Sequence, residues 1–477
     1  MNHTVKNIVL VKDIKSVRDS YDREHTIAEE LGRGGQGAVC RTANPEIVVK
    51  FVLENDCVVS KEKSPELFAR NDSEFKSILQ KPFPDRLHLA YPMARLQDYS
   101  GYLMRLMGDM TSFEHLVPFD EESIGKMAED GGHRRRFELL AKLAAILAKI
   151  HGSGMVYCDI SPNNVYVTEE PLSGIQNVWL IDADNIFIPG EEQDKIVYTP
   201  RYAAPELVSG KTYCSMNSDI YSFAVLAFES LAALHPFDGD GGEEDNWDSD
   251  TDENDGNAAG ADSLYSGSKP WVEDPENSSN HTGKGLPRQN FLTEETFRLF
   301  NMTFSEEGRN SPGTRPPAVL WARAFARSHA ASVRCQKCGM SFVYDGSQKR
   351  CQWCDEKLPD IFLLKNESGK IVFARELSEK FDFGLPEHLF SQFDTDSFFR
   401  TVLSIHSFDE SDAVEFRTVR RNLSEHHFFI SADGREEQIL NRYILKLEKR
   451  GKYSLRCKNN SGSECRLDIE LRRGNKK

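Results

Sequence analysis

The sequence lacks a hydrophobic run long enough to cross a membrane, because no stretch approaches the roughly 18 apolar residues that a membrane helix needs. Near the start, the apolar residues 8–11 are followed by Lys12 and are too few for the core of a signal peptide. The ten cysteines are scattered apart from one cluster, which does not suit a disulfide framework. We therefore expect a cytoplasmic protein in a reducing compartment, with a metal site and no membrane partner.

Acidic residues outnumber basic ones, 75 to 59. The formal net charge is -16, and residues 238–262 include 11 acidic side chains but neither lysine nor arginine. Such a field disfavours nucleic-acid binding, and so polar a segment cannot bury enough apolar surface to order itself. Asp248, Asp250 and Asp252 have the first ligand spacing of an EF-hand loop, but Glu253 stands where that loop needs glycine. We therefore expect a disordered, solvated insert, with a docking segment for a basic partner as the alternative.

A glycine-rich stretch is the first motif with chemical meaning. Residues 30–39 read Glu-Leu-Gly-Arg-Gly-Gly-Gln-Gly-Ala-Val, and glycines let a backbone approach phosphates closely. Dinucleotide-binding folds share this spacing, but there a helix follows, whereas here the β-patterned residues 47–52 follow and include Lys50. This order favours a hairpin lid with Lys50 pairing with phosphates; the alternative is a solvated lysine on an edge strand.

A polar stretch after a long apolar helix carries the second motif. Residues 135–150 have the pattern of a buried amphipathic helix, and Asp159 and Asn164 follow it, separated by four residues. The aspartate can accept the proton of an attacking hydroxyl, and the asparagine can hold a metal ion. Two short predicted strands then return the chain, so that Asp182 lies beside this loop. Hard oxygen ligands such as Asn164 and Asp182 suit Mg²⁺.

Three landmarks follow in order. Residues 198–206 end in Ala-Pro-Glu, residues 218–224 read Ser-Asp-Ile-Tyr-Ser-Phe-Ala, and Arg315 begins an Arg-Pro-Pro sequence before the last predicted helix of this region. These landmarks resemble motifs of protein kinases, and the resemblance implies that Asp219 is structural and holds the backbone of the loop around Asp159. It also implies a buried ion pair between Glu206 and Arg315, whose loss would be strongly destabilising.

Together, and in this order, these motifs resemble the eukaryotic-type protein-kinase catalytic domain over residues 25 to 330. The resemblance implies a two-lobed fold and transfer of the ATP γ-phosphoryl group, with Mg²⁺, to a hydroxyl of a protein substrate. The implied catalytic residues are Lys50, Asp159, Asn164 and Asp182, the last two as Mg²⁺ ligands. The implied nucleotide-binding residues are Leu31, Gly32, Gly34, Gly35, Gly37, Val39, Lys50, Glu74, Met104, Arg105 and Met107.

A predicted helix begins at Pro65, after a serine cap, and stops before Pro82. Glu74 in this helix is the expected ion-pair partner of Lys50. Glu66 is the alternative partner, and the simplest other interpretation is that Glu74 lies on the surface.

Two strands are predicted over residues 87–96 and 101–107. Residues 102–108 resemble the hinge of the family, whose backbone hydrogen-bonds the adenine edge. Met104 would line the back of this pocket, although apolar side chains there also suit an ordinary core.

The sequence departs from the family at four positions. Cys158 replaces an arginine, so no cation is present there for an activation-loop phosphate, and we predict activity that does not require phosphorylation of that loop. Ser161 replaces a lysine, which should weaken γ-phosphate stabilisation. Ala183 and Asp184 replace phenylalanine and glycine; Asp184 is predicted to be solvated, with cation binding as the alternative.

Two Cys-x-x-Cys pairs, Cys335 with Cys338 and Cys351 with Cys354, are separated by 12 residues. Four thiolates at this spacing suit tetrahedral Zn²⁺. A closed site of this kind is usually structural, because the metal bonds substitute for a core that so short a segment cannot supply. We therefore predict a zinc ribbon.

Beyond residue 361, short β-patterned runs alternate with turns and predict a small β-sandwich. A phosphopeptide-binding module similar to forkhead-associated domains is an alternative, but no binding site for it is evident. The order of kinase, four-cysteine ribbon and β tail resembles kinases of bacterial stress operons. Those operons also encode a von Willebrand A-type protein and a metal-dependent phosphatase, which are therefore the expected partners.

The predicted fold is α+β: a bilobal kinase-like domain, a small zinc ribbon and an all-β, sandwich-like domain. The expected boundaries are an extension at 1–25, the catalytic domain at 26–330 with its insert at 238–262, the ribbon at 331–358 and the β-rich domain at 359–477. The predicted function is that of a protein serine/threonine kinase. A pseudokinase scaffold is the main alternative; a small-molecule kinase is disfavoured by the substrate-docking segment 198–206.

Overall fold

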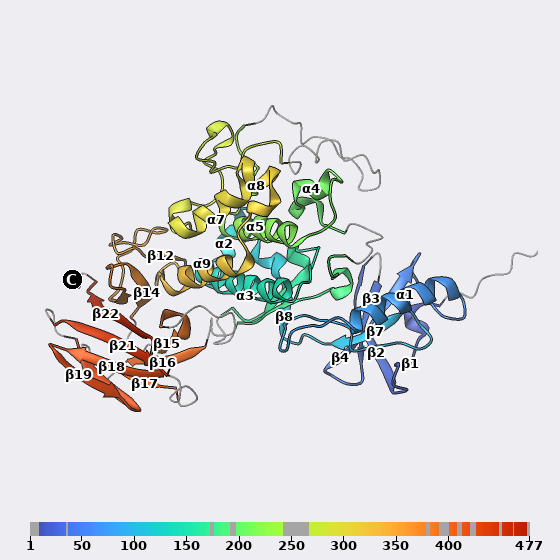
Figure 1. Ribbon diagram of the computed structural model, residues 1–477, viewed down its shortest axis with the longest axis horizontal. Helices are drawn as coiled ribbons and strands as arrows, with labels where there is room; N and C mark the ends of the chain where they lie inside the picture. Colours follow the sequence, from blue (N-terminus) through green and yellow to red (C-terminus); the bar gives the residue numbers. More distant parts are fainter. Residues whose placement is uncertain are drawn as a thin grey trace, which may run out of the picture.

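The computed structural model describes residues 9–34, 37–171, 176–190, 197–241, 267–377, 382–390, 400–407, 413–419, 426–447, 451–460 and 462–474. Most of the predicted acidic insert, residues 242–262, lies outside the described residues. Figure 1 shows a small sheet-containing lobe, a helical lobe in the middle and a pair of sheets at the C-terminal end. The two-lobed α+β architecture with a β-rich C-terminal region is thus confirmed.

The first lobe is a twisted antiparallel sheet with the strand order β1-β2-β3-β4-β7-β6, in which β5 pairs with β4. Part of the N-terminal extension belongs to it, because Val11, Ile14 and Val17 are buried in the core of this sheet. The strands are β1 (Ser16–Arg18), β2 (Glu24–Gly34), β3 (Gly37–Thr42), β4 (Ile47–Glu54), β5 (Cys57–Val58), β6 (Ala94–Arg95) and β7 (Gly101–Arg105).

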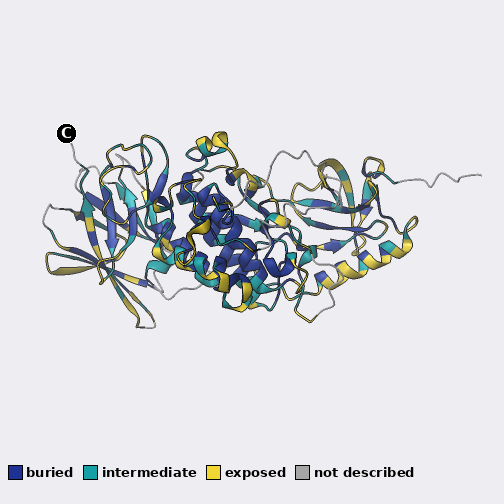
Figure 2. Cartoon of the chain, turned by 90° about the horizontal axis from the view of Figure 1, so that it is seen from above, coloured by how far each residue is buried: buried dark blue, intermediate teal, exposed yellow. Residues whose placement is uncertain are grey.

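A single helix, α1 (Pro65–Leu79), packs against this sheet and begins and ends where the sequence predicts. Its buried positions follow a helical repeat, and its other face is largely exposed (Figure 2). The strand predicted over residues 87–96 is much shorter than expected. Only β6 forms there, because Leu89 makes an isolated parallel bridge to Leu180 instead of joining a ladder.

The middle lobe is mainly helical and contains the largest buried core of the molecule (Figure 2). The apolar helix predicted over residues 135–150 is α3 (Gly132–Gly152), and it packs along α9 and α5. A small sheet of β8 (Met110–Ser112), β9 (Val165–Thr168) and β10 (Val178–Leu180) lies beside them. The other helices are α2 (Glu121–Lys126), α4 (Pro205–Val208), α5 (Met216–Ala232), α7 (Glu294–Phe304), α8 (Glu306–Asn310) and α9 (Ala318–Ala330).

The four-cysteine segment follows α9 directly and begins with the hairpin of β11 (Ser332–Arg334) and β12 (Ser341–Val343). This segment packs on the start of α3. The His133 ring stacks on Trp353 at a centroid distance of 5.4 Å, and the backbone N–H of Arg134 donates to Ser341 Oγ at 2.7 Å. The segment is therefore joined to the helical lobe by side chains as well as by the chain itself.

Two sheets form the C-terminal region and enclose a common hydrophobic core, as predicted for a sandwich-like domain. Their strand orders are β14-β13-β22-β21-β18-β19 and β15-β16-β17-β20. The strands are β13 (Ile361–Lys365), β14 (Ile371–Glu376), β15 (Asp382–Pro386), β16 (Thr401–Ser407), β17 (Ala413–Thr418), β18 (His426–Ala432), β19 (Arg435–Ile439), β20 (Arg442–Lys446), β21 (Tyr453–Asn459) and β22 (Glu464–Arg472).

Strand β13 links this region to the four-cysteine segment because both of its faces are buried. Phe362 and Leu364 point into the core between the two sheets, whereas Ile361 and Leu363 belong to the core around the cysteines. This division follows the two-residue repeat of a strand.

Among the helices of the described residues, none combines the length and apolar composition that a membrane crossing requires.

Candidate active site

Lys50 lies on β4 and reaches from the sheet lobe to the helical lobe. Its Nζ donates to Asp182 Oδ1 at 2.7 Å and to Asp184 Oδ2 at 2.9 Å. Burial disfavours the charged form of Lys50, but Tyr102 and the carboxylates of Asp184 and Asp182 raise the pKa of this lysine well above its ordinary value. Lys50 is therefore a permanent cation between the two lobes.

Asp159 and Asn164 lie together on the loop after α3. Asn164 Nδ2 donates to Asp159 Oδ2 at 2.9 Å and also to the Asp159 carbonyl at 2.9 Å. The Thr199 hydroxyl donates to Asp159 Oδ1 at 2.8 Å. Each oxygen of this carboxylate is thus oriented by a neighbouring side chain.

Asp219 on α5 binds the backbone of this loop. Its carboxylate accepts the backbone N–H groups of Tyr157 and Cys158, each at 2.8 Å, and lies 2.9 Å from His151 Nε2. Cys158 has a φ of 82°, in the left-handed region that non-glycine residues rarely adopt. The prediction that Asp219 is structural is confirmed, since it stabilises the strained turn just before Asp159.

Asp182 begins a second tight turn. Its backbone is left-handed, with φ 57° and ψ 60°, and a 3₁₀ turn follows over Ala183–Asn185. The amide of Ile181 donates to the Asn164 carbonyl at 3.0 Å, and the Tyr157 hydroxyl donates to the Ile181 carbonyl. These two bonds bring the start of this turn next to the loop of Asp159.

The glycine-rich stretch forms the β2–β3 hairpin above Lys50. Gly32 and Gly34 lie in β2, Gly37 and Val39 lie in β3, and Val39 pairs directly with Lys50. A Cβ atom on Gly37 would stand 2.9 Å from the carbonyl oxygen of Phe51. Leu31 is also on β2, whereas Gly35 lies outside the described residues.

The structure does not bring Glu74 to Lys50, contrary to the expected ion pair. Glu74 has 57% of its side chain exposed, and its nearest charged partner is Arg70, at 3.9 Å. Glu66 is also exposed. The buried positions of α1 are Phe68, Asn71, Phe75 and Ile78, so the rotation of this helix turns both glutamates away from the cleft.

Asp184 is likewise not the solvated side chain that we favoured. It binds the Lys50 ammonium instead, and no role for Asp184 on that lysine is evident in the sequence pattern. Thr199 is a second contact that the motifs do not reveal. In the sequence, only the position of Thr199 in the predicted docking segment hints at this contact.

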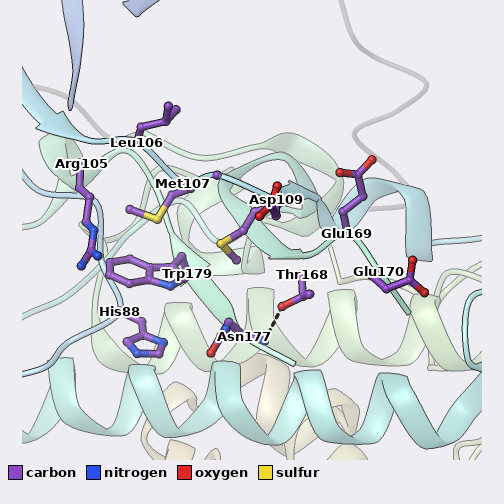
Figure 3. A pocket seen from close by; sticks show the side chains of 12 residues that line it. His88, Arg105, Leu106, Met107, Asp109, Thr168, Glu169, Glu170, Asn177 and Trp179 are labelled. Carbon is purple, nitrogen blue, oxygen red and sulfur yellow. Dashed lines mark hydrogen bonds between the residues drawn. The ribbon is translucent and has the colours of Figure 1, made fainter. Parts of the chain in front are cut away.

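The side chains of the predicted hinge residues lie in two different surroundings. Met104 packs against the cluster of Phe75, Ile78 and Tyr102. Arg105 and Met107 line a cavity of about 800 Å³, shown in Figure 3. The predicted hinge thus contributes side chains both to the surroundings of Lys50, whose Nζ lies 5.8 Å from the centre of the Tyr102 ring, and to this cavity. The remaining walls of the cavity are His88, Leu106, Gly108, Asp109, Met110, Thr168, Glu169, Glu170, Asn177 and Trp179.

The ion pair predicted between Glu206 and Arg315 is confirmed. Nη1 donates to Oε1 at 2.7 Å and Nη2 donates to Oε2 at 2.9 Å, and the Arg315 side chain is completely buried. The pair ties the end of the substrate-docking segment to the start of α9.

The four predicted metal ligands converge. The sulfurs of Cys335, Cys338, Cys351 and Cys354 all lie within 4.8 Å of one another. Cys335 Sγ is 3.7 Å from Cys354 Sγ, and Cys338 Sγ is 3.7 Å from Cys351 Sγ. A tetrahedral ion with bonds of about 2.3 Å to sulfur requires separations of roughly 3.8 Å, so these four thiols fit a single metal ion.

A family model described as protein kinase domain matches residues 25–265, just over half of the chain. This chain therefore belongs to the protein kinase family.

Individual relatives match segments of different length. Maternal embryonic leucine zipper kinase of Xenopus laevis is 34% identical over 103 residues, which are 21% of this chain and 15% of that protein. Serine/threonine-protein kinase PknA of Corynebacterium glutamicum is 31% identical over 119 residues, 25% of this chain and 24% of PknA. Serine/threonine-protein kinase dkf-2 of Caenorhabditis briggsae is 26% identical over 258 residues, 53% of this chain and 19% of dkf-2. The matches thus span less than a quarter of each of these relatives.

Proposed function

We propose that this protein is an ATP-dependent protein serine/threonine kinase, which transfers the γ-phosphoryl group of ATP to a hydroxyl of a protein substrate. The observation that carries the proposal is the 2.7 Å hydrogen bond from Lys50 Nζ to Asp182 Oδ1, between residues 132 positions apart in different lobes. A phosphate-binding lysine and a metal-binding carboxylate lie close together at a phosphoryl-transfer site.

Asp159 is the residue that orients the substrate hydroxyl and accepts its proton. Its two carboxylate oxygens are oriented by Thr199 and Asn164. Precise placement of this kind supplies much of the rate enhancement in phosphoryl transfer. Thr199 belongs to the docking segment 198–206, so its bond couples the platform for a protein substrate to the catalytic carboxylate. This coupling supports a protein substrate over a small molecule.

The residues present fit Mg²⁺ and ATP. Asp182 and Asn164 offer hard oxygen donors, and the Asn164 amide nitrogen is already engaged by Asp159, which leaves the amide oxygen to face another group. Lys50 would hold phosphate oxygens, and the β2–β3 hairpin would cover them with backbone. When bound, Mg²⁺ neutralises charge on the transferring phosphoryl group.

Regulation by loop phosphorylation is not required in this proposal. Cys158 stands where an arginine would bind an activation-loop phosphate, and it is buried at the side of Asp219. The carboxylate of Asp219 and the hydroxyl of Thr199 already hold the catalytic loop. We therefore expect activity in the unphosphorylated protein.

A nucleotide-binding pseudokinase scaffold is the second candidate. Ser161 favours it, because this buried residue stands where the family has a lysine that stabilises the γ-phosphate. Such a scaffold would recruit partners through the four-cysteine segment and the C-terminal sheets.

The four-cysteine cluster binds a structural Zn²⁺ ion in this proposal, and residues 331–358 form a zinc ribbon. Residues 26–330 are the catalytic domain and residues 359–477 the β-rich domain. Thiolate ligands suit a reducing compartment, so we place the protein in the cytoplasm. A von Willebrand A-type protein and a metal-dependent phosphatase remain the proposed partners.

Purified protein with Mg²⁺ and ATP tests the proposed activity, assayed for autophosphorylation and for transfer to generic protein substrates. Asp159→Asn and Asp182→Ala should each lower transfer on the order of 100-fold or more, because each removes a group that acts at the reacting atoms. Nucleotide binding without transfer by the unaltered protein would favour the pseudokinase. Undiminished transfer by Asp182→Ala would reject the assignment of this residue.

A further inference from the structure

The Lys50 ammonium lies between two carboxylates of one short segment. Asp182 and Asp184 flank a single residue at the start of the 3₁₀ turn after β10, and both bind Nζ. Lys50 has only 17% of its side chain exposed, so these neighbours, rather than water, balance its charge.

The two carboxylates have different surroundings. Asp182 is the more exposed, and the preceding residue is bonded to the backbone of Asn164, which places Asp182 beside the proposed metal ligands. Asp184 is the less exposed, with 30% of its side chain exposed against 39% for Asp182. Its Oδ1 atom is buried and, among the described residues, has no hydrogen-bond partner. Burial and the nearby Asp184 carboxylate raise the pKa of Tyr102 well above its ordinary value.

Helix α1, which is described throughout, offers Lys50 no carboxylate. None of its buried residues is acidic, and the polar one, Asn71, donates to Ser100 Oγ at 2.9 Å. Asp72 is engaged by Lys76 and Arg95. In a protein kinase that uses Mg²⁺ and ATP, the phosphate-binding lysine needs an acidic partner, and that partner normally comes from this helix.

We propose that Asp184 is the positioning residue for Lys50: it holds the ammonium in place when Asp182 is committed to the metal ion. This inference rests on the proposed kinase function and adds a role that α1 does not fill. Because a metal ion would draw the Asp182 carboxylate away from Lys50, one acidic partner has to remain beside the buried lysine. Asp184 is the carboxylate that is already bonded to Nζ.

A consequence concerns the sheet lobe. The anchor of Lys50 lies on the segment after β10, in the same turn as Asp182, and not on α1. Outward movement of α1 would therefore not carry the acidic partner of Lys50 away with it.

Four variants test the proposal. Asp184→Asn should lower kcat/KM for ATP on the order of 10- to 100-fold, mainly by misplacing Lys50. Asp184→Glu, which keeps the charge, should recover part of this loss. Glu74→Gln removes the competing candidate on α1 and should change kcat/KM by less than about twofold. Asp85→Asn is a matched change at an exposed residue of the same lobe and should have an equally small effect.

A double-mutant cycle shows whether Asp184 acts through Lys50. Nucleotide affinity is measured with a fluorescent ATP analogue and Mg²⁺, so that the cycle does not depend on turnover. Asp184→Asn should weaken binding in the unaltered protein, but should change it by less than about twofold in the Lys50→Met background. Thermal melting of each variant, without nucleotide, separates misfolding from a local effect.

Three outcomes would overturn the proposal: an Asp184→Asn variant with unchanged kinetics, a Glu74→Gln variant with an equal loss, or an Asp184→Asn effect that persists in Lys50→Met. The last would mean that Asp184 acts on the metal ion or on folding. Failure of the proposed function looks different. An unaltered protein that binds nucleotide without transferring phosphate rejects the kinase activity, while the binding cycle still decides the role of Asp184. A protein that binds no nucleotide rejects both.

Discussion

Arg315 and Glu206 are two single residues on which the helical lobe depends. Their two parallel hydrogen bonds are buried, and the Arg315 guanidinium also lies 4.9 Å from the centre of the Tyr221 ring. Removing one partner leaves the other charge buried without its counter-ion. We predict that Glu206→Gln lowers the free energy of unfolding by about 3–5 kcal/mol, measured by urea denaturation.

The control is Glu122→Gln, which breaks the exposed Glu122–Lys126 pair on α2. Exposed pairs contribute about 0–1 kcal/mol, so the urea midpoint of this variant should barely move. Equal effects of the two substitutions would show that burial does not determine the contribution of the Glu206–Arg315 pair.

His235 is a residue whose charge state should set part of the pH dependence of stability. Its Nδ1 accepts the backbone N–H of Phe237, and its Nε2 donates to the Arg201 carbonyl at 3.1 Å, so the ring is neutral in this arrangement. Burial and the neighbouring Arg201 lower the pKa of His235 to about 3. Below a pH of about 6.5 the unfolded chain binds a proton at His235, whereas the folded protein keeps this ring neutral.

The pKa of His235 is lower in the folded protein than in the unfolded chain. The stabilisation that depends on a neutral His235 is therefore fully present above a pH of about 6.5, and it is lost as the pH is lowered toward 3. This residue should contribute a slope of about 1.4 kcal/mol for each pH unit in that window. Urea denaturation at pH 7.5, 6.5 and 5.5 measures the slope, and His235→Gln should reduce it by the contribution of this one residue. The same slope in both proteins would assign the pH dependence to other groups.

At the scale of elements, the β2–β3 hairpin depends on the absence of a side chain at Gly37. A Cβ atom there would stand 2.9 Å from the Phe51 carbonyl oxygen on β4, closer than real Cβ atoms approach, and 3.6 Å from Lys50 Cε. We predict that Gly37→Ala lowers the free energy of unfolding by about 1–3 kcal/mol, because strand β3 has to shift away from β4. Thermal melting without nucleotide measures this.

Gly34→Ala is the comparison, since nothing described lies within 4 Å of a Cβ atom at that position. Its stability should change by less than about 0.5 kcal/mol. Similar melting temperatures for Gly37→Ala and the unaltered protein would mean that the hairpin accommodates the extra Cβ atom without a loss of stability. In that case, the close approach would not explain the glycine.

At the scale of the whole molecule, the four-cysteine segment joins the helical lobe to the C-terminal sheets. Trp353 donates to the Ser341 carbonyl at 3.0 Å and stacks on His133, while Ile361 and Leu363 of β13 pack around the cysteines. We predict one Zn²⁺ per chain and a fall of several degrees in the melting temperature when a chelator removes it. Metal bonds substitute for core in so small a unit, so their loss should loosen both neighbours.

Elemental analysis and thermal melting of Cys351→Ser test this prediction, and the substitution should reproduce the effect of the chelator. Cys57→Ser alters a cysteine of the sheet lobe outside the cluster and should retain both zinc and stability. A Cys351→Ser protein that lacks zinc but melts with the unaltered protein would show that the metal has no structural role.

The sequence by itself determined the candidate chemistry and the order of elements. Asp159, Asn164 and the Cys-x-x-Cys pairs are separated by a few residues, and at that range covalent geometry and turn formation constrain where side chains lie. The β-rich character of the region beyond residue 361 followed from short β-patterned runs, because strand formation also leaves a local pattern. The long-range Glu206–Arg315 pair could be predicted because both residues belong to motifs of one family.

The tertiary structure alone decided which acidic residue binds Lys50. Glu74 precedes the buried Phe75 by one residue, about 100° around α1, and this rotation places it in solvent. An amphipathic pattern defines a broad face but not the rotation of a helix to within one residue, so Glu74 and Asn71 could not be distinguished. Asp184 and Thr199 reach their partners across 134 and 40 positions, and such contacts depend on how distant segments of the chain pack together.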